Sequence, residues 1–90
     1  MDILGHKVRR VKGHSMEPLL QEGQVCIFKK KPHTINPIVI AEYHGREVVK
    51  RIVRIESGKV WLEGDNKSSH HNSIVPKKAI RGVLVWPQLK

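Results

Sequence analysis

A serine in a glycine-bounded turn and a lysine in a long apolar run are the residues whose types could carry chemistry. Ser15 lies in GHSMEPLLQEG, residues 13–23, and Lys50 lies in VVKRIV, residues 48–53. A serine hydroxyl needs a base before it can attack a carbonyl carbon, and a neutral lysine can be that base. The pair therefore suggests a serine nucleophile with a lysine general base.

Each residue also has an ordinary structural interpretation. Ser15 could cap one short helical turn over residues 15–22, because serine accepts a backbone N–H at a helix start and Gly23 would end the turn. A lysine in a strand commonly extends its stem so that the charged end reaches water. A lysine held away from water would instead have a lowered pKa, as a general base requires.

The elements that must position these residues are predicted to be β-strands. Runs rich in β-branched residues are punctuated by His44-Gly45 and Ser57-Gly58, which mark two tight connections. The pattern predicts a mainly β, antiparallel fold in a single domain over residues 1–90, with one short helical turn at the serine. The expected strands cover residues 24–30, 37–43, 46–56, 59–63 and 79–86.

Alternation along the longest expected strand assigns its side chains to two faces. One face carries Val48, Lys50 and Ile52, and the other carries Val49, Arg51, Val53 and Ile55. Each face thus holds one cation among apolar neighbours.

Composition limits the classes of partner. The chain has 17 Lys plus Arg against 8 Asp plus Glu, a net charge of +9, which attracts polyanions or anionic membrane surfaces weakly. Two tryptophans, one tyrosine and one phenylalanine are too few for a base-stacking platform. The lone Cys26 is expected in the core and excludes an internal disulfide.

Several functional classes are disfavoured by what the sequence lacks. No apolar run approaches the ~20 residues of a membrane-spanning helix, and the start does not resemble a secretory signal. If the sequence is complete, a cytoplasmic location is expected. The adjacent His70 and His71 lack metal-ligand spacing, so neither a metal nor another cofactor is expected. Two aspartates, Asp2 and Asp65, argue against a Ser-His-Asp triad.

Three blocks, in order, resemble the signal peptidase I family and its wider clan, which includes the LexA-type self-cleaving repressors. GHSMEPLLQEGQV, VVKRIV and LEGDNKSSHHNS are similar to the family's Ser-Met-x-Pro, Lys-Arg and Gly-Asp-Asn boxes. With the final glycine-containing strand, the resemblance covers nearly the whole chain from residue 11. The length and VWLEGDN also resemble small soluble members, notably the maturation proteases of nickel superoxide dismutase.

The resemblance implies that Ser15 is the nucleophile and Lys50 the general base, in a coiled antiparallel β fold with a partial barrel. It implies an oxyanion hole that includes the Ser15 N–H, with Gly13 where relatives often carry a second, hydroxyl donor. The implied substrate is a polypeptide, a precursor or leader peptide with small residues beside the scissile bond.

The last block departs from the family's pattern. His70 stands where a serine usually orients the lysine, and Asn72 and Ile74 replace an Asp and an Arg. Ser69 or Ser73 could supply the missing hydroxyl, and the sequence does not choose between them.

Two further sets of residues have expected roles. One is a structural turn whose aspartate accepts backbone N–H bonds, formed by Gly64, Asp65 and Asn66. The other is a shallow cleft that binds an extended peptide by β-addition, lined by Met16, Val25 and Ile27.

Two other functions stay open. The chain could be a non-catalytic basic β module that binds nucleic acid, with an affinity that falls steeply as salt rises. It could also be an inactive member of the family, in which replacing Ser15 would have no effect.

Overall fold

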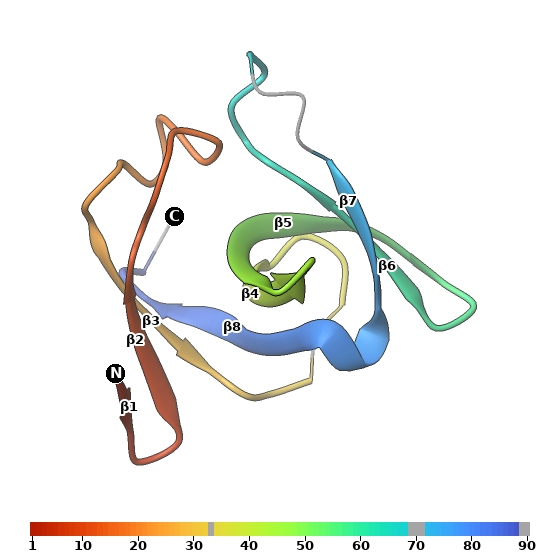
Figure 1. Ribbon diagram of the computed structural model, residues 1–90, viewed down its shortest axis with the longest axis horizontal. Coiled ribbons are helices and arrows are strands. Elements are labelled where there is room, and N and C mark those ends of the chain that lie inside the picture. The colour runs from red at the N-terminus through yellow and green to blue at the C-terminus, as the bar shows by residue number, and fades with distance from the viewer. Residues whose placement is uncertain (33, 69–71, 89–90) are drawn as a thin grey trace.

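The computed structural model describes residues 1–32, 34–68 and 72–88, and in this part of the chain eight strands form one coiled sheet (Figure 1). Neighbouring strands are antiparallel, in the order β1-β2-β3-β8-β4-β5-β6-β7. The mainly β, antiparallel fold predicted from the sequence is confirmed. The elements are β1 (Asp2–Ile3), β2 (His6–Arg10), β3 (Val25–Lys29), β4 (Ile38–Tyr43), β5 (Arg46–Glu56), β6 (Lys59–Glu63), β7 (Ser73–Pro76), the 3-10 turn η1 (Lys77–Ala79) and β8 (Ile80–Trp86).

Both predicted tight connections are two-residue hairpin turns. His44 and Gly45 have φ angles of 51° and 76°, and Ser57 and Gly58 have 52° and 77°. Two successive left-handed residues give the turn whose twist matches that of antiparallel strands. These turns join β4 to β5 and β5 to β6, so β5 has a hydrogen-bonded neighbour on each side.

The predicted two-face pattern of β5 holds only as far as Ile52. The register with β6 shifts between Ile52 and Arg54, so that Ile52 pairs with Leu62 and Ile55 pairs with Val60. Opposed residues of an antiparallel pair share a face, and the extra residue of a bulge reverses the alternation that follows it. The assignment of Ile55 to the face of Arg51 was therefore wrong.

Apolar side chains bury both faces of β4. Val39 and Ala41 belong to one core cluster, whereas Ile38 and Ile40 belong to a second. The first, called here the β cluster, is Val39, Ala41, Ile52, Val60, Leu62, Val75, Ala79, Ile80 and Val83. The second, called here the turn cluster, is Val11, Met16, Leu20, Cys26, Phe28, Ile38 and Ile40. The turn cluster confirms that Cys26 is a core residue and anchors the serine-containing segment through Met16 and Leu20.

The short helical turn predicted over residues 15–22 does not form a helix. Separate turns are present instead, with Glu17 N–H donating to His14 O at 3.1 Å and Leu20 N–H donating to Met16 O at 2.9 Å. A helix would need the Ser15 carbonyl as an internal acceptor. That carbonyl accepts a hydrogen bond from Asn66 N–H at 2.8 Å, so the segment is held by a distant loop.

In the described ranges, the chain forms no helix with the length and apolarity needed to cross a membrane.

Candidate active site

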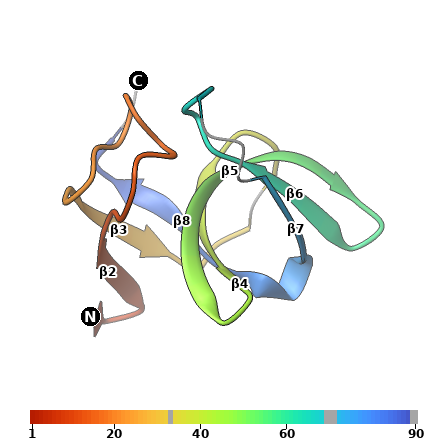
Figure 2. The same ribbon diagram turned by 45° about the horizontal axis from the view of Figure 1, so that its top comes forward.

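The turn that carries Ser15 is bound to the loop that follows β6. Asn66 donates its backbone N–H to Ser15 O and its side-chain Nδ2–H to His14 O, both at 2.8 Å. Its Oδ1 accepts a hydrogen bond from Ser68 N–H at 2.9 Å, which folds the loop back on itself. One asparagine therefore fixes two successive carbonyls of the serine turn, and both segments lie toward the upper part of Figure 2.

Gly64 makes the closest approach between the two segments. A Cβ built on Gly64 would lie 2.5 Å from Ser15 O and 3.0 Å from Ser15 Cβ. Distances this short to backbone atoms are not tolerated, so a larger residue would displace the serine turn. The glycine is required by the nearness of Ser15.

Lys50 is buried in the middle of β5. The residue is 5% exposed and pairs with Val39 of β4. Among the described residues it has no acidic partner and no hydrogen bond, and burial lowers the pKa of its amine below the ordinary value. The alternative in which the lysine extends to water does not describe this side chain.

The residue after Lys50 binds the same loop through a two-pronged ion pair. Arg51 Nε donates to Asp65 Oδ1 at 2.9 Å, and Nη2 donates to Asp65 Oδ2 at 2.8 Å. Arg51 Nη1 also donates to Asn36 O, and the hydrogen bond to Asp65 raises the pKa of the guanidinium. Asp65 thus ties the loop to β5, and in the part of the chain that the structure describes its carboxylate does not accept the backbone N–H bonds expected from the sequence. The sequence showed the adjacent Lys-Arg pair but gave Arg51 no such role.

Two backbone N–H groups near Ser15 differ in whether they already have an acceptor. Gly13 has a φ of 79°, and its N–H donates to Glu22 Oε2 at 3.0 Å, so this donor is already used. The Ser15 N–H has no acceptor among the described residues. A free N–H beside a nucleophile is the kind of donor that stabilises an oxyanion.

His14 lies next to Ser15 but faces carboxylates. Its Nδ1 is 2.8 Å from Glu17 Oε2, and its Nε2 is 3.7 Å from Glu22 Oε1. The hydrogen bond to Glu17, with the charges of both glutamates, raises the pKa of this exposed imidazole. Both ring nitrogens of His14 face carboxylates, and within the described residues the ring forms no hydrogen bond with the Ser15 hydroxyl.

The residues expected to line a substrate cleft have different exposures. Met16 is 1% exposed and packs inside the turn cluster, so it supports the turn and presents almost no surface. Val25 and Ile27 are half-buried on β3. Two hollows of about 530 and 610 Å³ are lined by other residues, and neither includes Ser15 or Lys50.

Of the two candidate hydroxyls for orienting the lysine, the structure describes one. Ser73 is 6% exposed and pairs with Leu62 at the start of β7. Ser69 and His70 lie outside the described residues. Asn72 and Ile74, which replace the family's Asp and Arg, are exposed, so they form no buried pair.

Comparison with known protein families places most of the chain in a family. The family model described as Peptidase S24-like matches residues 5–85, which include the serine turn, β5 and the loop after β6. No curated protein and no solved structure matches the chain. The matched range covers most of the sequence and agrees with the resemblance to the clan of LexA-type and signal peptidase I-type serine peptidases. The chain belongs to the Peptidase S24-like family.

Proposed function

We propose that the chain is a serine endopeptidase in which Ser15 is the nucleophile and Lys50 is the general base. The observation that carries this proposal is that Ser15 packs against Gly64. Gly64 directly follows β6, and β6 pairs with β5, the strand that holds the buried Lys50. Family membership supports the proposed reaction class, and the contacts of the serine turn support the choice of residues.

The strand register supports bringing the two side chains together. Arg51 pairs with Glu63, and continuing this register by one residue sets Gly64 opposite Lys50. Opposed residues in an antiparallel pair share a face. Gly64 and Lys50 would therefore lie on the same face of the sheet. Ser15 contacts this face at Gly64.

The proposed reaction has two steps that use the same lysine. Lys50 Nζ, neutral, takes the proton of Ser15 Oγ as Oγ bonds to the scissile carbonyl carbon. Lys50 then donates that proton to the leaving amine as the C–N bond breaks, which leaves an ester on Ser15. In the second step Lys50 deprotonates a water that attacks the ester, and returns the proton to Ser15 Oγ as the new carboxyl group leaves.

Two neighbouring groups have supporting roles in this proposal. The Ser15 N–H donates to the oxyanion, and Gly13 supplies no second donor because its N–H is bound to Glu22. Ser73 is the proposed source of the orienting hydroxyl, because it pairs with Leu62, which pairs with Ile52, two residues from Lys50 on the same face. Within the described residues no hydrogen bond joins Ser73 to Lys50, so this contact would form only when a substrate is bound.

The proposed substrate is an extended segment of a precursor or leader peptide. Half-buried Val25 and Ile27 offer apolar side-chain surface on β3. Because β3 is already paired with β2 and β8, the peptide would bind against these side chains rather than add as a strand to β3, which corrects the expected β-addition. A preference for small side chains beside the scissile bond is carried over from the family resemblance, as is the processing role.

Loss of one hydroxyl tests the proposal. Wild type, Ser15→Ala and Ser68→Ala are incubated with a pool of peptides from a digested proteome, and new termini are found by mass spectrometry. Ser68 is an exposed loop serine and is the matched control. We expect Ser15→Ala to lose at least ~10³-fold of the cleavage rate and Ser68→Ala to keep it.

Two results would overturn the proposal. Equal cleavage by wild type and Ser15→Ala would remove Ser15 from the mechanism. Absence of cleavage and of any Ser15 ester in wild type, with wild type folded, would favour an inactive family member.

A further inference from the structure

A hollow lined by four lysines lies away from the serine turn. Its volume is about 530 Å³, and it lies between the segment after β3 and the segment that contains η1. Figures 1 and 2 show η1 at the opposite end of the molecule from the serine turn. Its lining residues are Lys30, Lys31, Pro32, Lys77, Lys78, Ile80 and Gly82, and this set is called here the lysine hollow.

The cations of the lysine hollow are not neutralised by the fold. All four lysines are exposed, and none forms an ion pair with a described residue. Nearby Arg81, in contrast, has its guanidinium 3.4 Å from Glu42 Oε2. No acidic residue is among those that line the hollow. Four like charges around one hollow repel one another, so an anion bound there would relieve that repulsion.

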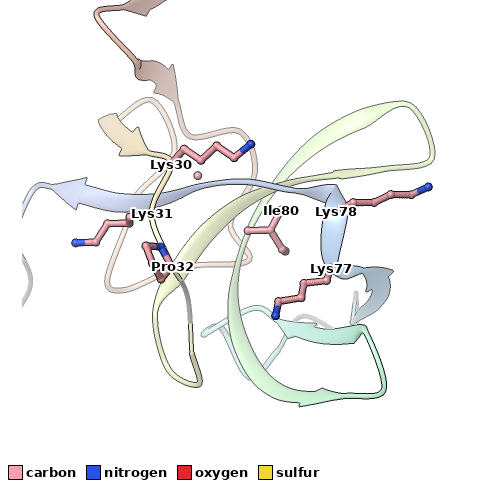
Figure 3. Close-up of a pocket in the computed structure, with 7 residues that line it drawn as sticks. Lys30, Lys31, Pro32, Lys77, Lys78 and Ile80 are labelled. Atoms are coloured by element: carbon pink, nitrogen blue, oxygen red, sulfur yellow. The ribbon is translucent and has the colours of Figure 1, made fainter.

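The arrangement of the lysines favours an elongated anion. Figure 3 shows their side chains spread around Pro32 and Ile80, with the ammonium groups pointing in different directions rather than toward one point. A single small anion could not reach several of them at once. The cations come in two adjacent pairs, Lys30 with Lys31 and Lys77 with Lys78, from the two segments that bound the hollow.

The geometry and the lining of the lysine hollow limit the classes of anionic partner that fit it. Because the ammonium groups point in different directions, a flat bilayer or a stiff duplex, with a persistence length of ~150 base pairs, would meet only those on one side of the hollow, whereas a flexible single strand can bend to reach both lysine pairs. Exposed Pro32 adds apolar surface against which a sugar ring can pack. No aromatic side chain lines the hollow, so bases would not be stacked or read.

We propose that the lysine hollow binds the phosphodiester backbone of single-stranded nucleic acid without regard to sequence. This site is separate from the proposed peptidase site and does not depend on Ser15. The proposal assigns nucleic-acid binding to a defined part of the basic surface. The chain could then bind nucleic acid in addition to cleaving peptides.

Binding of a fluorescent 20-nucleotide oligothymidylate, measured by anisotropy as salt is raised, tests the proposal. The hollow variant replaces Lys30, Lys31, Lys77 and Lys78 by Gln. The control variant has the same net charge and replaces four exposed cations elsewhere, namely Lys12, Arg46, Lys59 and Lys67, by Gln. All measurements use the Ser15→Ala protein as well as wild type, so that loss of peptidase activity and loss of binding are separated.

We expect the hollow variant to bind at least ~10-fold more weakly at low salt. Loss of four phosphate contacts should reduce the magnitude of the negative slope of log K against log salt by about 3, because each contact on a single strand contributes ~0.7. The control variant should retain most of that slope. Thermal unfolding shows whether each variant is folded, and the double variant Lys77→Gln/Lys78→Gln should show about half the effect.

Other outcomes would overturn the proposal. Equal weakening in both four-site variants would mean that net charge alone attracts the oligonucleotide. Absence of oligothymidylate binding by wild type at low salt, or tighter competition by polyglutamate than by oligothymidylate, would exclude this ligand. Hollow-dependent binding to anionic phospholipid vesicles without oligonucleotide binding would assign the lysines to a membrane surface.

Discussion

Burial of Lys50 costs free energy at neutral pH because its amine has left water without gaining an acidic partner among the described residues. The cost falls on the charged form and lowers the pKa of the amine in the folded protein. In the unfolded chain the amine regains its ordinary pKa of 10.5. The free energy of unfolding therefore rises with pH between the folded and unfolded pKa values, because the unfolded state binds more protons there.

Lys50→Met should make this cost visible. Methionine keeps an apolar stem of similar length, so we expect it to stabilise the fold by about 1–3 kcal/mol at pH 7, the range typical of a buried polar group without a partner. The gain should shrink as pH rises toward and past 10.5, because above that value the wild-type amine is neutral in both the folded and the unfolded state. Urea unfolding at several pH values measures it, and Lys59→Met, at an exposed site on β6, is the control.

Lys50→Met and Lys50→Arg also test whether Lys50 is the general base. Both should lose cleavage, because methionine has no amine and a guanidinium does not deprotonate at working pH. Retained cleavage in Lys50→Arg would exclude Lys50 as the base. A pH-independent stability change in Lys50→Met would mean that the amine is not desolvated.

Gly64 offers a second test at the scale of single residues. Gly64→Ala sets a methyl group against the Ser15 backbone, so we expect it to displace the serine turn, abolish most cleavage and cost about 1–3 kcal/mol. Gly58→Ala, in the turn between β5 and β6, is the control, because its φ of 77° disfavours a side chain although a Cβ there would meet nothing within 4 Å. Gly58→Ala should lower the melting temperature without lowering cleavage per folded molecule. Full activity in Gly64→Ala would show that the turn can move without loss of function.

At the scale of elements, the loop after β6 positions the serine turn through two separate attachments. Asp65 holds the loop to β5 through Arg51, and Asn66 holds the turn through the His14 and Ser15 carbonyls. The Gly-Asp-Asn block thus acts as a connector between β5 and the serine turn. A change in the ion pair should therefore affect catalysis without touching either proposed catalytic residue.

A double-mutant cycle on Arg51→Gln and Asp65→Asn tests the connector. Both side chains are partly buried and joined by two hydrogen bonds, so we expect a coupling energy of about 1 kcal/mol in unfolding. Each single variant should also lower cleavage and speed amide hydrogen exchange in the serine turn. The exposed pair Arg54 and Glu56 on the same strand is the control and should show coupling near zero. Equal coupling in the two pairs would reduce the Asp65 contact to a surface ion pair.

Sequence patterns predicted the five apolar strands because each carries enough β-branched residues to bury a face. They missed β1, β2 and β7, which are short or lie near the sheet edges. HKVRR in β2 has a single apolar residue, and SIVP in β7 has four residues that include a proline. Such strands depend on a partner strand for their structure, and that pairing is a tertiary property. The bulge at Val53 was missed for the same reason.

For the candidate site, the sequence motifs identified Ser15, Lys50 and the Gly-Asp-Asn block. They did not decide whether the Lys50 amine is buried away from water. A buried lysine and a lysine that extends to water give the same alternation of apolar and polar residues along the strand. Contacts that join residues far apart in the chain, such as Asn66 with His14, leave no local pattern. The roles of Arg51 and Asn66 therefore came only from the structure.

At the scale of the whole molecule, one sheet joins two core clusters. β4 contributes Val39 and Ala41 to the β cluster and Ile38 and Ile40 to the turn cluster, so neither cluster can be lost without exposing one face of this strand. The charge of +9 opposes compaction, and a chain of this size has a total stability of only about 5–13 kcal/mol. If residues 1–90 fold as the single unit predicted from the sequence, the two clusters should be lost together.

Matched isoleucine-to-valine changes test whether the clusters unfold together. Ile40 and Ile52 are 1% and 0% exposed, the first in the turn cluster and the second in the β cluster, and each change should cost about 0.5–1.5 kcal/mol. In a single cooperative unit, both variants shift one unfolding transition, and the costs add in the double variant within about 0.5 kcal/mol. Tryptophan fluorescence and far-ultraviolet circular dichroism should then give the same midpoint for each variant. If Ile40→Val separated the two transitions, the turn cluster would unfold alone, and the serine turn could loosen while the rest of the sheet stayed folded.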